Sequence, residues 1–276
     1  MTPSRTVLVT GATDGLGLAL AERLAADGAD LILHGRDRAR LDRIADRFTA
    51  RGPAGPRTVT ADLADLDQVR RMAAEIRAST DRLDVLVNNA GIGGGQPDGR
   101  TRRTSADGHE LRFAVNHLAG VLLTLELLPL LRASAPARIV NVASIGQHPL
   151  DFGNLMLEHD YDGFRAYGQS KLAQIAFGFE LAARLPAGEV TVNSLHPATY
   201  MPTKIVLAEV GYSVDTLEEG VTATRRLVTD PALAGITGRF YDRTREARAH
   251  SQAYDTEDRL RLWRASLELT KAESPL

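Results

Sequence analysis

The chain has 276 residues, enough for one large α/β domain or two small ones. Its 33 basic and 35 acidic side chains leave a net charge of −2, which argues against a surface built for nucleic acid or for an anionic membrane. The chain has no cysteine, so disulfides, thiolate nucleophiles and cysteine-ligated metal sites are excluded.

The start of the chain is expected to carry no targeting segment. Only a few residues separate Met1 from the first apolar run at 6–9, which leaves no room for a signal peptide. No apolar run is expected to approach the ~20 residues that a membrane span needs. We therefore expect a cytoplasmic protein with no membrane partner.

Short β-branched runs alternate with longer amphipathic stretches along the whole chain. The runs predict strands at 6–9, 31–33, 58–60, 85–87, 139–142, 190–195 and 238–241. The amphipathic stretches predict helices at 16–26, 39–48, 66–76, 110–131, 164–185 and 216–228. No repeat or Pro/Gly linker divides the chain. This alternation predicts an α/β fold in which residues 1–276 form one domain, a single doubly wound parallel sheet of Rossmann type with helices on both faces.

A glycine-rich turn joins the first expected strand to the first expected helix. It reads Thr10-Gly11-Ala12-Thr13-Asp14-Gly15-Leu16-Gly17, with the spacing G-x-x-x-G-x-G. Glycines at such a turn let the backbone approach a pyrophosphate, whose charge is met by amides at the helix N-terminus. A plain glycine turn is the alternative. The residues that we predict to bind a dinucleotide here are Gly11, Thr13, Asp14, Gly15, Leu16 and Gly17.

The end of the second strand indicates which dinucleotide is bound. Folds that select NAD usually carry a carboxylate about twenty residues past the glycines, where it binds the ribose 2′-hydroxyl. Here that position is Gly35, and Arg36 follows it. An arginine can pair with a 2′-phosphate through two hydrogen bonds. We predict NADP (NADPH) as the cofactor and Arg36 as its 2′-phosphate ligand, with a solvated loop arginine as the alternative.

Further segments complete a known pattern when they are read in order. Asn88-Asn89-Ala90-Gly91 ends the fourth expected strand, and Asn116 lies on the helix after it. Ser144 follows the fifth strand, and Tyr167-Gly168-Gln169-Ser170-Lys171 opens the next helix. Together with the glycine loop, this set closely resembles the classical short-chain dehydrogenase/reductase (SDR) family, from about residue 6 to residue 241.

The resemblance implies that Asn116, Ser144, Tyr167 and Lys171 are the catalytic set. Tyr167 would be the general acid/base, Ser144 would hydrogen-bond the substrate oxygen, and Asn116 would support a water relay. Lys171 would hold the nicotinamide ribose, and Tyr167 would also contact the cofactor. These residue types suit the chemistry, because reducing a ketone requires a proton and hydrogen-bond donors at its oxygen. Lys171, four residues after Tyr167, can lower a phenol pKa that is otherwise near ~10.

The resemblance also implies further cofactor contacts. Asp62 and Leu63, after the third strand, would meet the adenine. Asn89, Ala90 and Gly91 would form the ribose contact and a turn that stabilises the sheet.

Pro197 matches a turn that precedes a nicotinamide-binding threonine in the family. The sequence departs from the family pattern here, because Ala198 stands where glycine is usual and Thr203 falls one place late. Thr199 and Thr203 therefore both stay candidates for the nicotinamide contact.

The stretches 107–110, 113–118 and 170–173 resemble the retinol-dehydrogenase-like branch of the family. So does the interval from Ser144 to Tyr167, which is 23 residues where roughly a dozen is usual. The branch implies a small lipophilic substrate, but kinship of fold is a poor guide to substrate and retinoid activity does not follow.

Loops near 148–164 and 198–215 are expected to form a substrate lid. Apolar residues of the first loop, Phe152 and Met156 among them, alternate with acidic ones, which suits a wall over the cleft. A surface excursion or a subunit contact is the alternative.

Other conspicuous residues are expected to be structural. The basic run 100–103 is expected to be a solvated loop, and His117 is expected to pack within a helix. The run 122–131 is expected to be a buried helix face. A second subunit of a homo-oligomer, a dimer or tetramer, could also share that face. His148 and His159, with Glu158 and Asp160, lack the i,i+4 histidine spacing of a metal pair, so no metal site is predicted.

These observations predict an NADP-dependent oxidoreductase that acts on a small molecule, as a ketone or aldehyde reductase or as the reverse dehydrogenase. A non-catalytic NADP(H)-binding sensor or scaffold is the alternative, but such a protein would be expected to have lost Tyr167 or Lys171. An epimerase or dehydratase on the same scaffold is less favoured, because those relatives are generally longer.

Overall fold

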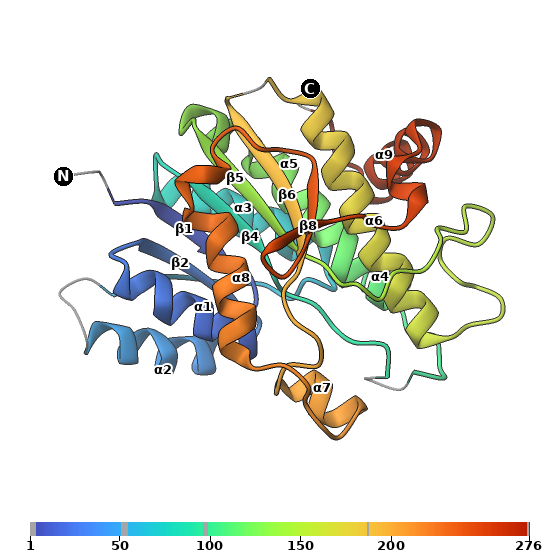
Figure 1. The fold of residues 1–276 in the computed structure, drawn as a ribbon, viewed down its shortest axis with the longest axis horizontal. Coiled ribbons are helices and arrows are strands. Elements are labelled where there is room, and N and C mark those ends of the chain that lie inside the picture. The colour runs from blue at the N-terminus through green and yellow to red at the C-terminus, as the bar shows by residue number, and fades with distance from the viewer. Residues whose placement is uncertain (1–3, 51–54, 96–98, 187, 275) are drawn as a thin grey trace.

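An eight-stranded sheet forms the centre of the structure (Figure 1), a computed structural model that describes residues 4–50, 55–95, 99–186, 188–274 and 276. The spatial order is β3-β2-β1-β4-β5-β6-β7-β8, in which β8 pairs antiparallel with β7 and the other pairs are parallel. The predicted fold class is confirmed, and each predicted strand is present; β8 was not predicted. The strands are β1 Thr6–Val9, β2 Asp30–Gly35, β3 Arg57–Thr60, β4 Val85–Asn88, β5 Ala137–Val142, β6 Val190–His196, β7 Arg239–Asp242 and β8 Arg245–Ala247.

The helices connect these strands. Each predicted helix is present, but the one expected at 110–131 is divided by a π-helical turn at Ala114–Leu118, and α7 and α9 were not predicted. The helices are α1 Gly15–Ala26, α2 Arg38–Thr49, α3 Leu66–Ser79, α4 Leu111–Phe113, α5 Ala119–Ala133, α6 Gly163–Arg184, α7 Lys204–Glu209, α8 Leu217–Thr229 and α9 Thr256–Thr270.

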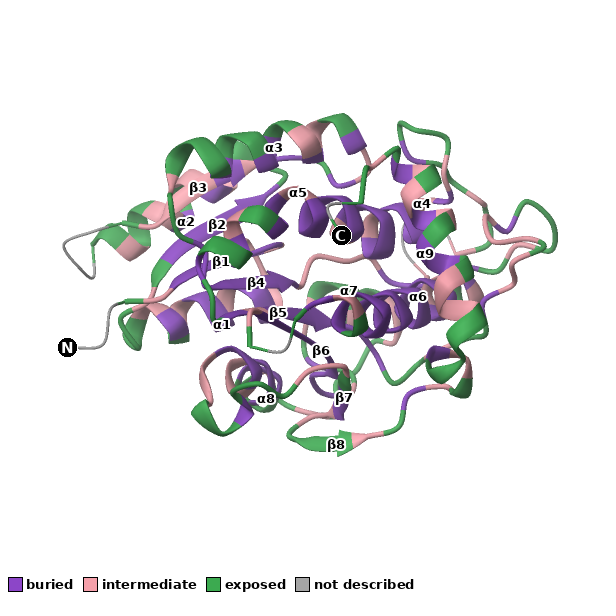
Figure 2. Ribbon diagram, turned by 90° about the horizontal axis from the view of Figure 1, so that it is seen from above, coloured by how far each residue is buried: buried purple, intermediate pink, exposed green. Residues whose placement is uncertain are grey.

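The central strands are buried on both faces, because helices cover each side of the sheet. Figure 2 shows α3 and α5 above the strands and α1 and α8 below them. In β1, Val7 and Val9 pack with α1, α2 and α8, while Leu8 points to the opposite side and packs with α3 and α5. This alternation follows from the two-residue period of a strand.

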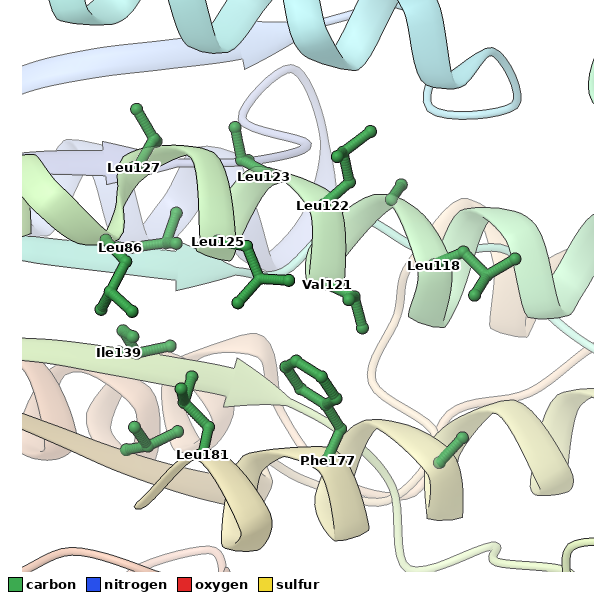
Figure 3. Packing of buried hydrophobic residues seen from close by; sticks show 14 of the residues in the cluster. Leu86, Leu118, Val121, Leu122, Leu123, Leu125, Leu127, Ile139, Phe177 and Leu181 are labelled. Atoms are coloured by element: carbon green, nitrogen blue, oxygen red, sulfur yellow. The ribbon is translucent and has the colours of Figure 1, made fainter. Parts of the chain in front are cut away.

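The larger core cluster joins α5 and α6 to the sheet. Figure 3 shows Val121 and Leu125 of α5 pointing towards the side on which Phe177 of α6 and Ile139 of β5 lie. The helical run Leu111–Ala133 is apolar and long enough to cross a membrane, with a mean hydropathy of 1.6, so the expectation that no such run exists is wrong. Within the fold, 72% of its most apolar window is buried, as is common for a core helix.

The carboxyl ends of the parallel strands meet at one edge of the sheet. There Val9 is paired with Leu33 on one side and Val87 on the other, and Asn88 is paired with Asn141. The loops that follow these strands carry most of the residues predicted to be functional. In doubly wound folds this edge is where ligands bind.

Candidate active site

The glycine loop after β1 lies flat against the end of β4. Gly11 has φ of +66°, and a Cβ there would lie 2.9 Å from Ala90 Cα. A Cβ on Gly17 would lie 2.2 Å from the Gly11 carbonyl oxygen. Only glycine fits at these two positions, so the N-terminus of α1 approaches the loop closely enough to present its amides to an anion.

The turn after β4 is bonded directly to the glycine loop. The Thr10 hydroxyl accepts hydrogen bonds from the amides of Asn89 at 2.9 Å and Ala90 at 3.0 Å. The Asn89 side chain donates to the Thr10 carbonyl at 2.8 Å. The structure therefore brings together two segments that the sequence predicts to share the cofactor.

Asp14 caps α1 and also carries an ion-pair cluster. Its Oδ1 accepts from the Gly15 amide at 2.8 Å, while Oδ2 lies 3.0 Å from Arg40 Nη2 and 3.0 Å from Lys204 Nζ. Burial opposes ionisation, but the bonds from Lys204 and Arg40 lower the pKa of Asp14 below its usual range. Because Lys204 begins α7, this cluster ties α7 to the glycine loop.

The end of β2 adjoins the same loop. A Cβ on Gly35 would lie 2.4 Å from Thr13 Cγ2, so the absence of a side chain there makes room for Thr13. Arg36 follows and is exposed, and it forms no hydrogen bond or ion pair with another described residue. Its guanidinium is therefore available to an added anion beside the loop.

The two residues after β3 that were predicted to contact the adenine differ in burial. Asp62 is exposed, and its Oδ1 accepts from the Ala64 amide at 2.9 Å. Leu63 is buried in the larger core cluster, and Leu16 of the glycine loop is buried in the smaller one.

The Tyr167 hydroxyl lies close enough to the Ser144 side chain for the serine to affect its pKa, although 23 residues separate the two along the chain. Ser144 Oγ accepts from the Gly146 amide at 3.0 Å, which fixes the hydroxyl. Burial raises the pKa of Tyr167, the nearby Ser144 side chain opposes this effect, and nearby Glu209 adds to it. The tyrosine therefore needs a cation to ionise near neutral pH.

Lys171 supplies a cation next to that ring. Its Nζ lies 5.8 Å from the centroid of Tyr167 and donates to the Val142 carbonyl at 2.9 Å. Burial lowers the pKa of Lys171 to about 8, so the side chain is mostly charged at neutral pH. A Cβ on Gly91 would lie 3.6 Å from the same Nζ.

Asn116 lies on the π-helical turn between α4 and α5. Its Oδ1 accepts from the Ile92 amide at 2.8 Å, and its Nδ2 lies 3.0 Å from both the Ile92 carbonyl and Ser170 Oγ. The side chain thereby holds the segment after β4 next to α6. Turns of this kind are frequent at functional sites.

The predicted nicotinamide segment starts at Pro197, which is buried. Thr199 lies in a polar network: its amide donates to Asp215 at 2.6 Å, its hydroxyl lies 3.1 Å from His196 Nε2, and Arg243 forms an ion pair with Asp215. Thr203, in contrast, lies over the glycine loop, since its Cγ2 would be 3.1 Å from a Cβ on Gly15.

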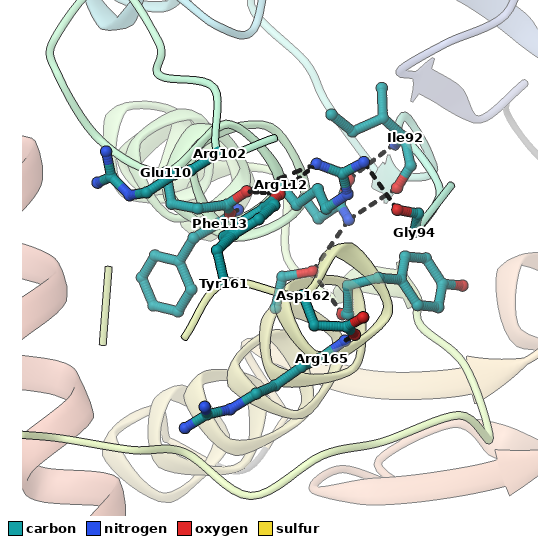
Figure 4. Close-up of polar contacts among 12 residues, drawn as sticks. Ile92, Gly94, Arg102, Glu110, Arg112, Phe113, Tyr161, Asp162 and Arg165 are labelled. Atoms are coloured by element: carbon teal, nitrogen blue, oxygen red, sulfur yellow. Dashed lines mark hydrogen bonds and ion pairs between the residues drawn. The ribbon is translucent and has the colours of Figure 1, made fainter. Parts of the chain in front are cut away.

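A buried charged cluster near the site was missed by sequence reasoning. Arg112 Nε and Nη2 donate to the carbonyls of Gly93 at 2.7 Å and Gly94 at 2.8 Å, and Nη1 lies 2.6 Å from the Tyr161 hydroxyl (Figure 4). That hydroxyl donates to Glu110 at 3.0 Å. Neither Arg112 nor Glu110 has more than 1% of its side chain exposed. The cluster joins the loop after β4 to the segment before α6.

Phe152 and Met156, expected to line the cleft, are partly buried and pack against the larger core cluster. The guanidinium of Arg261, on α9, lies 4.5 Å from the centre of the Phe152 ring. Arg102, expected in a solvated loop, is partly buried and donates to the Met156 carbonyl at 2.9 Å. This part of the 148–164 loop is therefore bound to the body of the protein.

Exposed apolar side chains surround the catalytic edge. Phe164 lies against Gly94, Ile205 lies against Gly93, and Tyr200 is close enough to raise the pKa of Tyr167. Others lie in the loop after β5 and in the segment 200–214. The exposed large apolar residues of these segments are Ile145, Phe164, Tyr200, Ile205, Leu207, Tyr212 and Val214.

Two of the expectations drawn from the sequence concern His117 and a metal site. His117 is buried, hydrogen-bonds with Ser266 at 2.8 Å and contacts Phe113 and Phe177, so its predicted packing role is confirmed. Over the described ranges, no group of three or more His, Asp or Glu side chains could hold a metal ion.

Known proteins resemble this chain over most of its length. The model of the family described as short chain dehydrogenase matches residues 5–209. Human retinol dehydrogenase 13 is 35% identical, over 99% of this chain and 86% of that protein. Mouse retinol dehydrogenase 14 is 37% identical, over 94% of this chain and 84% of that protein.

Solved structures share the fold. A short chain dehydrogenase from Salmonella enterica serovar Typhi is 27% identical with a TM-score of 0.70, covering 87% of this chain and 95% of that one. RhlG of Pseudomonas aeruginosa, in an active-site complex with NADP, is 26% identical with a TM-score of 0.69 and the same coverage.

Proposed function

Because this chain belongs to the short chain dehydrogenase family, we propose that it is an NADP-dependent oxidoreductase that acts on a carbonyl or alcohol group of a small lipophilic molecule. The family predicted from the sequence, including its retinol-dehydrogenase-like branch, is thereby confirmed. The observation that carries the proposed activity is the proximity of the Tyr167 hydroxyl to Ser144, with Lys171 buried next to the tyrosine ring.

Each catalytic side chain has a task that follows from its surroundings. Ser144, fixed by the Gly146 amide, donates to the substrate oxygen and orients it. Tyr167 transfers its hydroxyl proton to that oxygen during reduction and takes it back during oxidation. The Lys171 ammonium stabilises the phenolate that remains. Asn116, which holds Ile92 next to Ser170, supports a water relay behind the lysine.

The residues around the loop fit a dinucleotide, which supplies or accepts the hydride at its nicotinamide when bound. The close approach of Gly17 to Gly11 makes a cradle that any larger side chain would fill. The proposed contacts are the glycine loop (Gly11, Thr13, Asp14, Gly15, Leu16, Gly17) for the pyrophosphate, Asp62 and Leu63 for the adenine, Asn89, Ala90, Gly91, Tyr167 and Lys171 for the ribose, and Pro197 with a threonine for the nicotinamide.

The geometry also supports one choice of cofactor and one choice of nicotinamide-binding threonine. The exposed guanidinium of Arg36, next to the loop, supports NADP over NAD. The position of Thr203 over Gly15 supports Thr203 over Thr199, whose groups are engaged by Asp215 and His196.

We also propose that the loops near 148–164 and 198–215 form a substrate lid. The apolar rim that they carry, with Phe164 and Tyr200 near the catalytic tyrosine, supports a lipophilic substrate. A cytoplasmic location is supported by the burial of the one long apolar helix in the described part of the chain. Assembly into a dimer or tetramer and the absence of nucleic-acid partners stay predictions.

The proposal is tested by mixing purified protein with NADPH and a panel of ketones and aldehydes and following the cofactor's absorbance. We expect turnover with bulky apolar carbonyls and little with small polar ones. Tight NADPH binding without turnover of any carbonyl, or of any alcohol with NADP, would favour the sensor or scaffold alternative.

A further inference from the structure

His34 is a buried histidine on β2 that the proposed reaction does not use. It is 2% exposed and lies near the carboxyl end of its strand, one residue before Gly35. Its ring Nδ1 lies 3.2 Å from the Gly11 amide nitrogen, and its Nε2 lies 3.1 Å from the Ala61 carbonyl oxygen. One side chain therefore bonds to the loops that follow β1 and β3.

These two contacts determine the state of the ring. Nδ1 faces an N–H group and must accept, while Nε2 faces a carbonyl and must donate. The imidazole is therefore neutral, with its proton on Nε2. If the ring gained a second proton, it would sit on Nδ1. The Nδ1–H and the Gly11 amide N–H would then face each other, and the bond to Gly11 would break.

Among the described residues, the hydrogen bonds that reach Gly11 and Ala12 from β2 both come from His34, so the start of the loop depends on this residue. The Ala12 amide donates to the His34 carbonyl at 2.9 Å, so backbone and ring hold successive residues of the loop. Gly11 in turn lies in contact with Gly17 on α1 and with Ala90 after β4. A shift of Gly11 would therefore move the N-terminus of α1 relative to the rest of the site.

We propose that His34 is a positioning residue of the dinucleotide site, whose neutral imidazole holds the glycine loop at a fixed spacing from the end of β3, so that acid weakens cofactor binding. The inference rests on the proposed function, because it assumes that this loop binds a dinucleotide. Its effect belongs to binding and not to catalysis, since His34 touches neither Tyr167 nor Ser144.

The surroundings of the ring favour its neutral form. Burial lowers the pKa of His34 below its usual 6.5, while the Ala61 carbonyl and the Asp62 carboxylate oppose that effect. From the other elements around the ring, β1 and the glycine loop present backbone, and Arg36, two residues along β2, is exposed. Asp62 is thus the charge that acts on the imidazole.

Two variants separate the two hydrogen bonds. In His34→Asn the shorter amide can offer an oxygen where Nδ1 stood, and in His34→Gln the longer amide can offer a donor where Nε2 stood. Dissociation constants for NADPH and NADH are measured for the wild type and both variants from pH 5 to 8. Thermal melts verify that each variant is folded.

We expect His34→Gln to bind both cofactors about tenfold more weakly at pH 7.5, because the Gly11 amide loses its acceptor. We expect His34→Asn to bind nearly as well as the wild type at pH 7.5. The wild type should then lose affinity relative to His34→Asn severalfold as the pH falls to 5. A ratio is used because the 2′-phosphate of NADPH also titrates near pH 6. The kcat at saturating cofactor should be unchanged.

Equal affinities of all three proteins at every pH would overturn the inference. Equal weakening of both variants would also overturn it, because the ring would then merely fill space. A wild type that binds neither cofactor at pH 7.5 would instead contradict the proposed function.

Discussion

Tyr167 and Lys171 show how burial sets the requirements of the proposed reaction at the level of single residues. Burial raises the pKa of the tyrosine and lowers that of the lysine to about 8, so it disfavours the charged form of both. The contact between them offsets part of that effect, because a charged lysine favours a charged phenolate. Proton transfer therefore depends on the pair and not on either side chain alone.

The first prediction concerns the proposed acid/base. Tyr167→Phe removes the hydroxyl and keeps the ring, so NADPH binding should survive while kcat falls by about 10²–10⁴. Steady-state kinetics and a binding titration check both parts. The matched control is Tyr254→Phe, which removes a hydroxyl that accepts from the Ala249 amide, and it should turn over normally. Near-normal kcat in Tyr167→Phe would remove the tyrosine from the proposed mechanism.

The second prediction concerns cofactor choice. Arg36→Ala should weaken NADPH binding about ten- to a hundredfold and leave NADH nearly unchanged, because a charge-assisted pair contributes about 1.5–3 kcal/mol. Titration of the wild type and Arg36→Ala with NADPH and with NADH checks this expectation. The control is Arg38→Ala, which removes an exposed arginine paired with Asp42 at 2.9 Å on α2. Equal losses for NADPH and NADH would mean that Arg36 is structural.

Sequence reasoning could name the residues of local motifs but not those defined by distant partners. Gly11 and Lys171 were found because their spacing to neighbours along the chain carries the signal. His34 bonds to a residue 23 positions away, and Arg112 to one 49 positions away, so no local pattern reveals either bond. A polar residue within an otherwise apolar run, such as His34 within β2, is a signal that could have pointed to such a buried bond.

Among the elements, the helix predicted at 110–131 departs most clearly from expectation. Its periodicity is continuous, yet the π-helical turn at Ala114–Leu118 interrupts it, because the Asn116 amide bonds to Ile92 and Ser170. The unpredicted α7 and β8 are short, and their formation depends on contacts made only after folding. The unpredicted α9 has a buried Trp263 among many charged residues, which weakens its apolar pattern.

The third prediction concerns the cluster that joins two loops. Arg112→Met leaves Glu110 buried without its ion-pair partner, so the free energy of unfolding should fall by about 3–5 kcal/mol. Combining it with Glu110→Gln should restore part of the loss. Urea denaturation measures these changes. Arg132→Met, which removes an exposed pair with Glu189, should change stability by about 1 kcal/mol or less. A similarly small effect for Arg112→Met would contradict the assigned role.

At the scale of the whole molecule, a single parallel sheet with helices on both faces followed from the alternation of runs along the chain. Right-handed βαβ connections leave few arrangements open, which is why the Rossmann-type sheet could be predicted without knowledge of contacts. The antiparallel edge at β8 could not, because a hairpin at Arg243 does not alter that alternation. The shape of the proposed lid was also beyond prediction, since side chains from distant elements determine it.

The fourth prediction concerns stability in acid. Burial lowers the pKa of His117 from 6.5 to about 3, so the ring stays neutral in the folded protein while it gains a proton in the unfolded chain below pH 6.5. The stability that this provides is complete above pH 6.5 and is lost as the pH falls towards 3. By pH 5 the loss should be about 2 kcal/mol.

His117→Gln should lack that part of the pH dependence while keeping a donor for Ser266. His148→Gln, which alters an exposed histidine, should behave as the wild type does. Urea denaturation at pH 5 and pH 7.5 checks these expectations. Parallel pH profiles for the wild type and His117→Gln would show that His117 does not titrate on unfolding.

The irregular segment between β5 and α6 is held by donors that lie outside it. Gln252 donates to the Leu150 carbonyl at 3.2 Å, Gln169 to the Leu155 carbonyl at 2.8 Å, and Arg102 to the Met156 carbonyl at 2.9 Å. Because these bonds end on the backbone, they do not depend on which side chains the segment carries. Its exposed positions can accumulate mutations at little cost to folding, which makes the segment a natural place for a lineage, or a directed-evolution library, to acquire a new specificity.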